Sequence, residues 1–298
     1  MIAGVHATLE RGGRSDPHAL RVAVERRLSV LLPDEAGTGD LGAALRYSLL
    51  APAKRIRPLL TILAGWEAGP QDLTALDAGC ALEMVHTASL ILDDMPAMDD
   101  APERRGRAST HVRYGEDVAM LSTIALLNHA YATVAGMHQV SAEARCRLVT
   151  ILARAIGLQG LTGGQYADLR PGERREANSI ARTTHLKTGV LFVAAVEMAA
   201  VIHGMTADAA DKLRGCATEL GQAFQILDDL IDSRTFLANG RREDDGKPTL
   251  LALLGQDATH RQLQAHMDGA LRHLQPAGHL AGFVRSIFAD VVRLPEAV

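Results

Sequence analysis

The sequence predicts an all-α fold in a single domain that spans residues 1–298. Of these residues 47% are hydrophobic but only 3% are aromatic, and alanine, leucine and methionine are abundant. This composition favours helices that pack closely through small side chains. Hydrophobic residues recur at helical spacing between short turns, whereas alternating β-branched segments are scarce. No repeat of fixed period and no low-complexity linker divides the chain.

The periodicity gives the helices in order. We expect them at 17–32, 40–51, 57–68, 73–92, 118–134, 142–169, 178–203, 207–232, 249–253, 258–274 and 280–294. The most polar interruption, 233–248, carries two glycines, a proline and many charges. It is predicted to be a long exposed loop, and such loops in compact domains are often functional.

Charge and cysteine content exclude several classes of protein. A net charge of -4 argues against nucleic-acid binding through a basic face. The three cysteines, Cys80, Cys146 and Cys216, are far apart, which favours neither a disulfide framework nor a zinc cluster. The longest apolar run, 190–202, is interrupted by Glu197 and is shorter than the roughly 20 residues that span a bilayer. We therefore expect a cytoplasmic protein without a transmembrane segment.

The stretch LILDDMPAMDD, 90–100, places four aspartates at the end of an apolar helix. Such close like charges repel by about 1 kcal/mol or more per pair, so water or a cation must screen them. Pro96 disfavours helical geometry at the residue before it, so the helix should end just after Asp94. The chain can then curl back and bring Asp99 beside Asp93.

Other polar residues extend this acidic group. His86 lies two helical turns before Asp93, and Ser89 lies one turn before it, so the three side chains share one stripe. Arg104 and Arg105 follow shortly after the acids.

A second acidic group, GQAFQILDDLID, occupies 221–232. Asp228 and Asp232 lie at i and i+4 on one helix face, which Gln225 and Gly221 extend. Magnesium is typically held by one or two carboxylates together with substrate phosphates. Two such clusters beside one cavity would bind a polyphosphate through bridging metals. The alternative is that each cluster is a solvated helix end, but two clusters on otherwise apolar helices favour metal binding.

With these motifs the chain resembles the trans-isoprenyl diphosphate synthases, the polyprenyl synthetase family. LDDMPAMDD and LDDLID are similar to the family's two aspartate-rich motifs, and AKRIRPLL is similar to its basic GGKRLRP segment. Further family blocks follow in the right order: EMVHTASLILDDMPAMDDAPERRGRASTH, LTGGQYADL, HLKTGVLF and DDGKPTLLALLG. The resemblance covers nearly the whole chain and is closest to bacterial geranylgeranyl diphosphate synthases of carotenoid pathways.

The resemblance implies a helical bundle of the isoprenoid synthase type with a central substrate cavity. It also implies a homodimer, and Mg²⁺ as the cofactor with three ions per active site. The residues implied to hold the metal are Asp93, Asp94, Asp99, Asp228, Asp229 and Asp232. Those implied to complete the site of the allylic diphosphate are Arg104, Lys187, Thr188, Gln225 and Lys247. Those implied to bind isopentenyl diphosphate are Lys54, Arg57, His86 and Arg105.

Individual residues also have simpler explanations. Lys54 and Arg57 could belong to a solvated face, and His86 or Gln225 could be an ordinary hydrogen-bonded helix residue. Lys187 lies in a largely apolar segment, where an unpaired buried charge is unfavourable, so a functional role explains it better.

The implied reaction condenses isopentenyl diphosphate with dimethylallyl, geranyl or farnesyl diphosphate. The departing diphosphate is stabilised by metals and cations, an allylic carbocation forms, and the isopentenyl double bond attacks it. Asp93, Asp94, Asp99, Lys187 and Asp228 form the implied catalytic set. By family analogy the proton is lost to the released diphosphate, so no side chain is needed as a general base.

Small residues predict the product length. Ala88 and Ser89 stand five and four residues before Asp93, where farnesyl-producing relatives place an aromatic residue. The hydrocarbon pocket should therefore stay open to twenty carbons, with its floor near 120–124, and Ala88→Tyr should shorten the product. The alternative explanation is close helix packing, for which small residues are also used.

Three other functions stay open. A farnesyl diphosphate synthase would stop at fifteen carbons. A terpene cyclase would not need Lys54, Arg57, His86 and Arg105. A non-catalytic partner subunit would be expected to lose aspartates from one motif, and here both motifs are intact.

The chain also departs from the family pattern. The two glycines before Lys54 are replaced by proline and alanine, and Ala108 and Ser109 replace a proline and a threonine. Glu103 adds a carboxylate beside Arg104.

Overall fold

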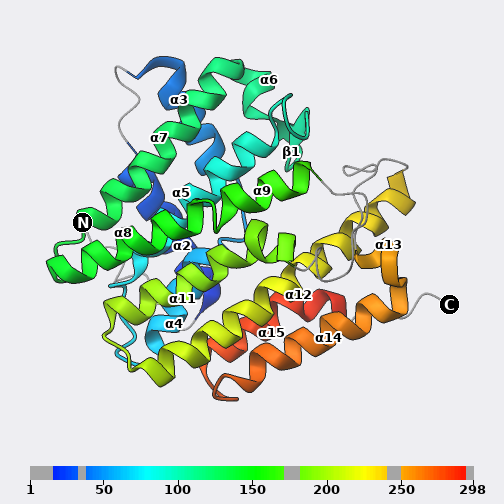
Figure 1. Cartoon of the computed structure of the whole chain (residues 1–298). Coiled ribbons are helices and arrows are strands. Elements are labelled where there is room, and N and C mark those ends of the chain that lie inside the picture. Colours follow the sequence, from blue (N-terminus) through cyan, green and yellow to red (C-terminus); the bar gives the residue numbers. More distant parts are fainter. Residues whose placement is uncertain (1–15, 33–37, 171–181, 240–249, 293–298) are drawn as a thin grey trace. The chain divides into compact units, whose positions relative to one another are not determined.

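The structure, a computed structural model, describes residues 16–32, 38–170, 182–239 and 250–292. These residues are almost entirely helical (Figure 1). Their strand content is a short antiparallel hairpin, in which Glu103 pairs with Ala108 and Arg104 with Arg107. The predicted all-α class is therefore confirmed.

The chain divides into two compact units, one formed by 1–153 with 198–204 and the other by 154–197 with 205–298. The elements that begin in the first unit are α2 (Pro17–Leu31), α3 (Gly39–Leu49), α4 (Ile56–Trp66), α5 (Leu76–Asp93), β1 (Glu103–Arg104), β2 (Arg107–Ala108), α6 (Thr110–Tyr114), α7 (Glu116–Ala135) and α8 (Ala142–Ile156). Those that begin in the second are α9 (Leu161–Leu169), the π-helix η1 (His185–Gly189), α11 (Val190–Ile202), α12 (Ala207–Asn239), α13 (Leu250–Leu254), α14 (Gln256–Arg272) and α15 (His279–Val292). The single-domain partition stays a prediction.

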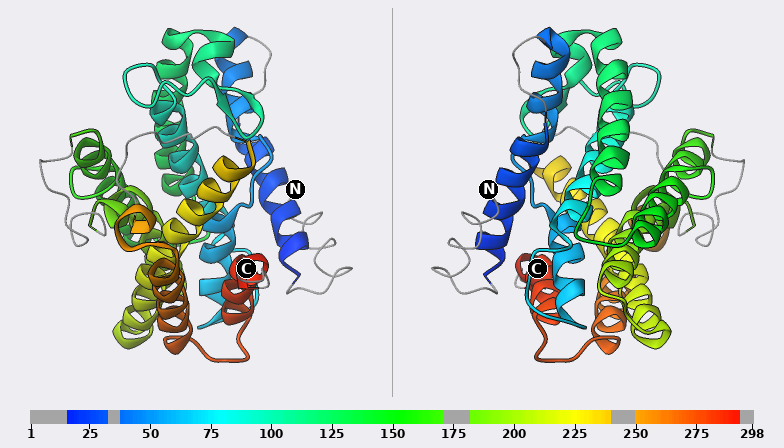
Figure 2. Two further views of the ribbon diagram at one scale, coloured as in Figure 1. Left: turned by 90° about the vertical axis from the view of Figure 1, so that its right-hand side faces the viewer. Right: turned by 90° about the vertical axis from the view of Figure 1, so that its left-hand side faces the viewer.

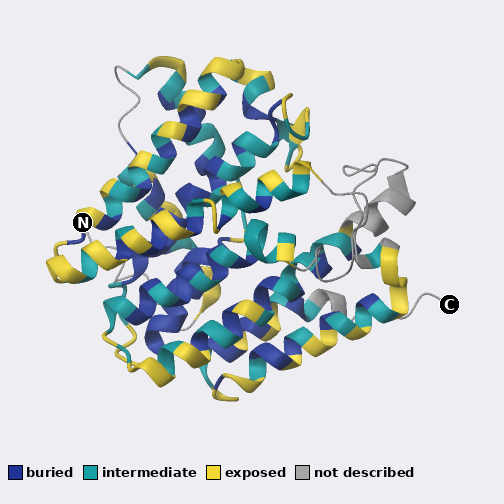
Figure 3. Cartoon of the chain, viewed as in Figure 1, coloured by how far each residue is buried: buried dark blue, intermediate teal, exposed yellow. Residues whose placement is uncertain are grey.

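Helix α5 is the centre of the first unit and packs against α2, α3, α4 and α7 (Figure 2). All residues of α4 are buried (Figure 3), and all but Arg57 and Thr61 are apolar or glycine. Gly79 allows α4 and α5 to approach closely, because a Cβ there would lie 2.8 Å from the Cα of Pro58. Arg27 of α2 binds Asp77 of α5 through two hydrogen bonds of 2.6 and 2.8 Å. This core fixes the helix that carries the first aspartate motif.

Helix α12 organises the second unit and packs along α14. His266 of α14 contacts Glu219 of α12 across this interface, with 2.6 Å between Nδ1 and Oε2. Helix α12 also contacts η1, α13 and α15. These contacts hold α12 itself, the helix that carries the second aspartate motif.

Several predicted boundaries were wrong. The helix expected at 142–169 is interrupted between α8 and α9, where the Gly160 N–H donates to the carbonyl oxygen of Gly157 in a turn. The helix expected to end at 232 continues to Asn239, so the first part of the expected loop is helical. The remainder of that loop lies outside the described residues.

Two described helices, Glu116–Ala135 and Arg182–Ile202, are long and apolar enough to cross a membrane by length and composition. This is weak evidence for a membrane protein, because the core helix of a soluble protein can have the same properties. The prediction of no transmembrane segment considered only the apolar run 190–202. The helix at 116–135, which was expected at 118–134, was not considered as a span.

Candidate active site

The first aspartate motif forms a tight turn at the end of α5. The helix ends at Asp93, and the N–H of Asp99 donates to the carbonyl oxygen of Asp93 at 3.0 Å. The N–H of Ala101 likewise donates to the carbonyl oxygen of Asp94 at 3.2 Å. The predicted curl after Pro96 is confirmed, and Asp93 and Asp99 are both half-buried.

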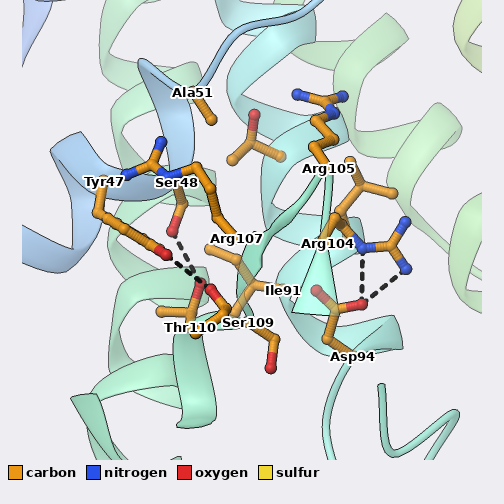
Figure 4. Close-up of a pocket in the computed structure, with 13 residues that line it drawn as sticks. Tyr47, Ser48, Ala51, Ile91, Asp94, Arg104, Arg105, Arg107, Ser109 and Thr110 are labelled. Carbon is orange, nitrogen blue, oxygen red and sulfur yellow. Dashed lines mark hydrogen bonds and ion pairs between the residues drawn. The ribbon is translucent and has the colours of Figure 1, made fainter. Parts of the chain in front are cut away.

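Asp94 has different surroundings. Its side chain is 4% exposed, and Arg104 binds it with both Nε and Nη2 at 2.6 Å from Oδ1 (Figure 4). Burial raises the pKa of the Asp94 carboxyl, and the adjacent Arg104 guanidinium opposes that shift. In this structure Asp94 therefore fixes Arg104. The metal-ligand role that the resemblance implied for Asp94 stays a prediction.

Arg104 and Arg105 lie on the hairpin that sequence periodicity did not predict. Arg105 and Gly106 form its two-residue turn and both have positive φ angles, 55° and 71°. Two positive φ angles in such a loop are the geometry of a type I′ turn, whose twist matches that of the flanking strands. The turn projects Arg105 at the exposed tip, whereas Arg104 points back to Asp94 (Figure 4).

Helix α3 holds the hairpin from its other side. The Tyr47 hydroxyl donates to the carbonyl oxygen of Ala108 at 2.7 Å, and the Arg107 guanidinium lies 3.9 Å from the centre of the Tyr47 ring. The Ser48 and Thr110 hydroxyls are 2.9 Å apart. A pocket lies between α3, α5 and the hairpin (Figure 4). Its lining residues are Tyr47, Ser48, Ala51, Thr87, Leu90, Ile91, Asp94, Arg104, Arg105, Arg107, Ala108, Ser109 and Thr110.

The departures from the family pattern fit this hairpin. Ser109 closes its base, because its backbone N–H and its hydroxyl both donate to the carbonyl oxygen of Pro102, at 3.0 and 3.2 Å. Glu103 is exposed, and Arg104 has Asp94 as its ion-pair partner. The extra carboxylate therefore leaves the geometry of Arg104 intact.

The basic segment and His86 also belong to the first unit. Lys54 is exposed, and Arg57 is buried in the first turn of α4. Burial lowers the pKa of His86 well below its ordinary value of 6.5, and the positive charges of Arg57, Arg105, Arg104 and Arg55 lower it further. Of the cations predicted to bind isopentenyl diphosphate, Arg57 and Arg105 thus lie close enough to affect the His86 imidazole.

The two predicted chain-length residues have different surroundings. Ala88 is completely buried inside the packing of α5. Ser89 is half-buried, and its hydroxyl donates to the carbonyl oxygen of His86 at 2.8 Å. On α5 Ser89 is therefore the more accessible of the two.

The predicted pocket floor at 120–124 stays a prediction. Met120, Leu121 and Ile124 are between 48% and 56% exposed. Ser122 and Thr123 are buried on the side of α7 that packs in the unit's core. Of the predicted floor, only these two small residues point inward.

In the second unit, three of the predicted residues form a connected polar chain, and a fourth has a separate ion-pair partner. The Thr188 hydroxyl donates to Gln225 Oε1 at 3.0 Å, and Gln225 Nε2 donates to Asp229 Oδ1 at 3.0 Å. Lys187 Nζ donates to Asp168 Oδ2 at 3.0 Å. Asp228 is half-buried on the same helix as Gln225 and Asp229. The side chains of two predicted residues are not described. Lys247 lies outside the described residues, and only the backbone of Asp232 is described.

The Lys187–Thr188 segment has an unusual backbone. It forms the π-helix η1, a local widening that is frequent at functional sites. Close glycine contacts support it on two sides. A Cβ at Gly164 would lie 2.6 Å from the backbone nitrogen of Lys187, and one at Gly221 would lie 2.8 Å from the Cα of Gly189.

The donor set fits magnesium. Asp93 and Asp99 present half-buried carboxylates, the oxygen ligands that Mg²⁺ prefers. Within the described part of the chain, no three His, Cys, Asp or Glu side chains form a complete metal site. Mg²⁺ held by Asp93 and Asp99 would take its other ligands from water and substrate phosphates.

Several residues that contact or neighbour the predicted site residues were not identified from the sequence. Asp168 lies in the family-like block LTGGQYADL but was given no role, although it pairs with Lys187. Glu83 precedes His86 by one helical turn and binds Arg55. Tyr47 had no sequence signal, because its contacts lie about sixty residues away along the chain.

Comparisons with known proteins show the family of this chain. The family model described as polyprenyl synthetase matches residues 39–276. The chain is 44% identical over 267 residues to a geranylgeranyl diphosphate synthase of Pantoea ananas, covering 89% of this chain and 88% of that protein. It is 40% identical over 269 residues to the geranylgeranyl diphosphate synthase of Pseudescherichia vulneris, with coverage of 89% and 88%.

Solved structures of prenyl diphosphate synthases are also similar to this chain. An apo FPP/GFPP synthase from Zymomonas mobilis is similar with a TM-score of 0.81 at 33% identity, covering 98% of this chain and all of that one (100%). A geranyltranstransferase from Thermotoga maritima has a TM-score of 0.77 at 27% identity, with coverage of 93% and 99%. By sequence and by fold, this chain belongs to the polyprenyl synthetase family.

Proposed function

We propose that the protein is a trans-prenyltransferase that condenses isopentenyl diphosphate with allylic diphosphates and releases mainly geranylgeranyl diphosphate. The observation that carries this proposal is the turn that brings Asp99 back to Asp93 beside an arginine-bearing hairpin. The similarity to two bacterial geranylgeranyl diphosphate synthases supports the substrate class. The allylic substrates would be dimethylallyl, geranyl and farnesyl diphosphate.

The allylic diphosphate would be held by charged groups that are already oriented. Asp94 holds Arg104, and Asp168 holds Lys187. Such preorganised cations stabilise the negative charge that develops as the diphosphate leaves. Bound Mg²⁺, three ions per site by family analogy, would add Lewis-acid stabilisation of that same charge. Asp93, Asp94 and Asp99 would supply its first set of oxygen ligands, and Asp228, Asp229 and Asp232 the second.

Isopentenyl diphosphate would bind without metal, through charge-assisted contacts to Lys54, Arg57, His86 and Arg105. Because the pKa of His86 is well below 6.5, its imidazole is neutral at pH 7 and offers one N–H donor. Apolar walls around the hydrocarbon exclude the water that would quench a carbocation. The proton lost after condensation would leave with the diphosphate, so none of these residues acts as a general base.

We propose that the enzyme works as a cytoplasmic homodimer. Met120, Leu121 and Ile124 form an exposed apolar face on α7, and a second copy of the chain would cover it. Light scattering after gel filtration should give a dimer, and Leu121→Glu should give monomers. A monomeric wild type would remove this part of the proposal.

Steady-state assays with radiolabelled isopentenyl diphosphate, Mg²⁺ and each allylic diphosphate test the proposed activity. The expected main product after dephosphorylation is the twenty-carbon alcohol. A fifteen-carbon main product would indicate the farnesyl alternative, and the absence of any product would indicate a non-catalytic subunit.

A further inference from the structure

We propose that the buried ion pair between Arg55 and Glu83 is a positioning device for the basic segment 54–57. Neither residue would touch the substrate, but together they would set how Lys54 and Arg57 meet isopentenyl diphosphate. This inference deepens the proposed function and rests on it.

The first observation is the backbone of Arg55. This residue precedes α4 and has φ 53° and ψ 38°, the left-handed conformation that residues with a Cβ rarely adopt. Left-handed residues of this kind persist only where their surroundings hold them, and they concentrate at functional sites. The segment before it contains Pro52 and Ala53 rather than glycines, so its conformation has to be held by contacts.

The contacts of the Arg55 guanidinium provide that restraint. Nη1 donates to Glu83 Oε1 at 2.8 Å, and Nη2 donates to the carbonyl oxygen of Ala51 at 2.9 Å. The two side chains are only 1% and 3% exposed. One guanidinium thus closes the segment onto its own start and fastens it to α5.

The position of Glu83 connects this restraint to the site. Glu83 lies on α5 one helical turn before His86. Lys54 directly precedes Arg55, and Arg57 follows it in the first turn of α4. The ion pair therefore fixes two of the predicted diphosphate-binding cations relative to a third group, His86, on a different helix.

The negative charge of Glu83 distinguishes a positioning role from a purely electrostatic one. Glu83 is an anion beside a cluster that is proposed to bind an anion, so its charge by itself opposes diphosphate binding. If Glu83 acted only through its charge, removing it would tighten binding. If it acts by positioning, removing it weakens binding despite the gain in net positive charge.

The experiment measures Glu83→Gln, Arg55→Lys and a double variant that combines Arg55→Met and Glu83→Leu. Each variant is measured at a temperature where circular dichroism shows it folded. The double variant removes both buried charges, so its thermal midpoint should recover relative to the single variants. We expect the Kd for isopentenyl diphosphate, measured by calorimetry without metal, to rise at least tenfold in the double variant. The apparent KM for that substrate should rise in parallel, and the KM for farnesyl diphosphate should stay within twofold.

Asp77→Asn is the matched control. It breaks the ion pair that Asp77, on the same helix as Glu83, makes with Arg27 of α2. It should lower the thermal midpoint without changing either KM. The inference is overturned if loss of Glu83 tightens binding, if the double variant regains wild-type affinity, or if the control weakens binding equally. A wild type that makes no product would instead remove the proposed function.

Discussion

Replacing Ser89 with phenylalanine should shorten the product from twenty to fifteen carbons. Ser89 is half-buried and lies four residues before Asp93, which is about 6 Å along α5. The added ring would reduce the room for hydrocarbon below the aspartates, and the twenty-carbon tail requires the most of that room. The early condensations need less of this space and should stay fast.

The size of the effect follows from the volume that is lost. One methylene that no longer fits an apolar pocket changes the activation barrier by about 1–3 kcal/mol, and about 1.4 kcal/mol is a factor of ten. Loss of room for a whole isoprene unit should slow the final condensation at least tenfold. Ala88→Tyr should have the same effect on product length, but Ala88 is completely buried. Overpacking at this position should lower the free energy of unfolding by about 1–3 kcal/mol.

The assay is chromatography of the dephosphorylated products, with circular dichroism melting for stability. Ser89→Ala is the control, because it removes the hydroxyl that donates to His86 and adds no bulk. It should still make the twenty-carbon product. Unchanged product length in both bulky variants, with normal early condensations, would refute the assignment of the ruler to this part of α5.

Three further predictions concern charge. Asp93→Ala or Asp228→Ala should lower turnover by orders of magnitude at saturating Mg²⁺ and leave the melting temperature unchanged or higher, because one repulsive carboxylate is gone; near-normal turnover in either variant would contradict the metal-binding role. Lys54→Ala should raise the KM for isopentenyl diphosphate more than that for the allylic substrate, and since Lys54 is exposed, stability should change by less than about 0.5 kcal/mol; an equal rise in both KM values would contradict separate sites. Because the folded-state pKa of His86 is lowered, the unfolded state takes up the proton first as the pH falls, so the free energy of unfolding of the wild type should decrease below about pH 6.5. In urea unfolding, the free energy of unfolding of His86→Asn should depend less on pH, and an equal pH dependence in both proteins would refute the prediction.

Features encoded by local chemistry could be predicted from the sequence. Pro96 ends α5 because it restricts the residue before it, and the backbone contact between Asp99 and Asp93 follows from that stop. The stripe that carries Gln225 and Asp228 follows from helical spacing alone. The family-like motifs added the roles of these residues.

Features that depend on tertiary contacts could not be predicted. The hairpin around Arg105 has strands of two residues each, too short to show an alternating pattern. The π-helix at Lys187 has no periodic signal and fits closely against Gly164 and Gly221. The pairing of Arg55 with Glu83 joins positions 28 residues apart, and spacing along one helix says nothing about such a contact.

A single-turnover experiment measures the proposed prenyl transfer itself. The purified protein, in excess over farnesyl diphosphate, would be mixed with Mg²⁺ and radiolabelled isopentenyl diphosphate, and the products quenched over time. We expect one exponential phase, which requires Mg²⁺, in which the bound farnesyl diphosphate is converted into the twenty-carbon diphosphate. Farnesyl diphosphate that stays unconverted, or conversion that is equally fast without the metal, would contradict it.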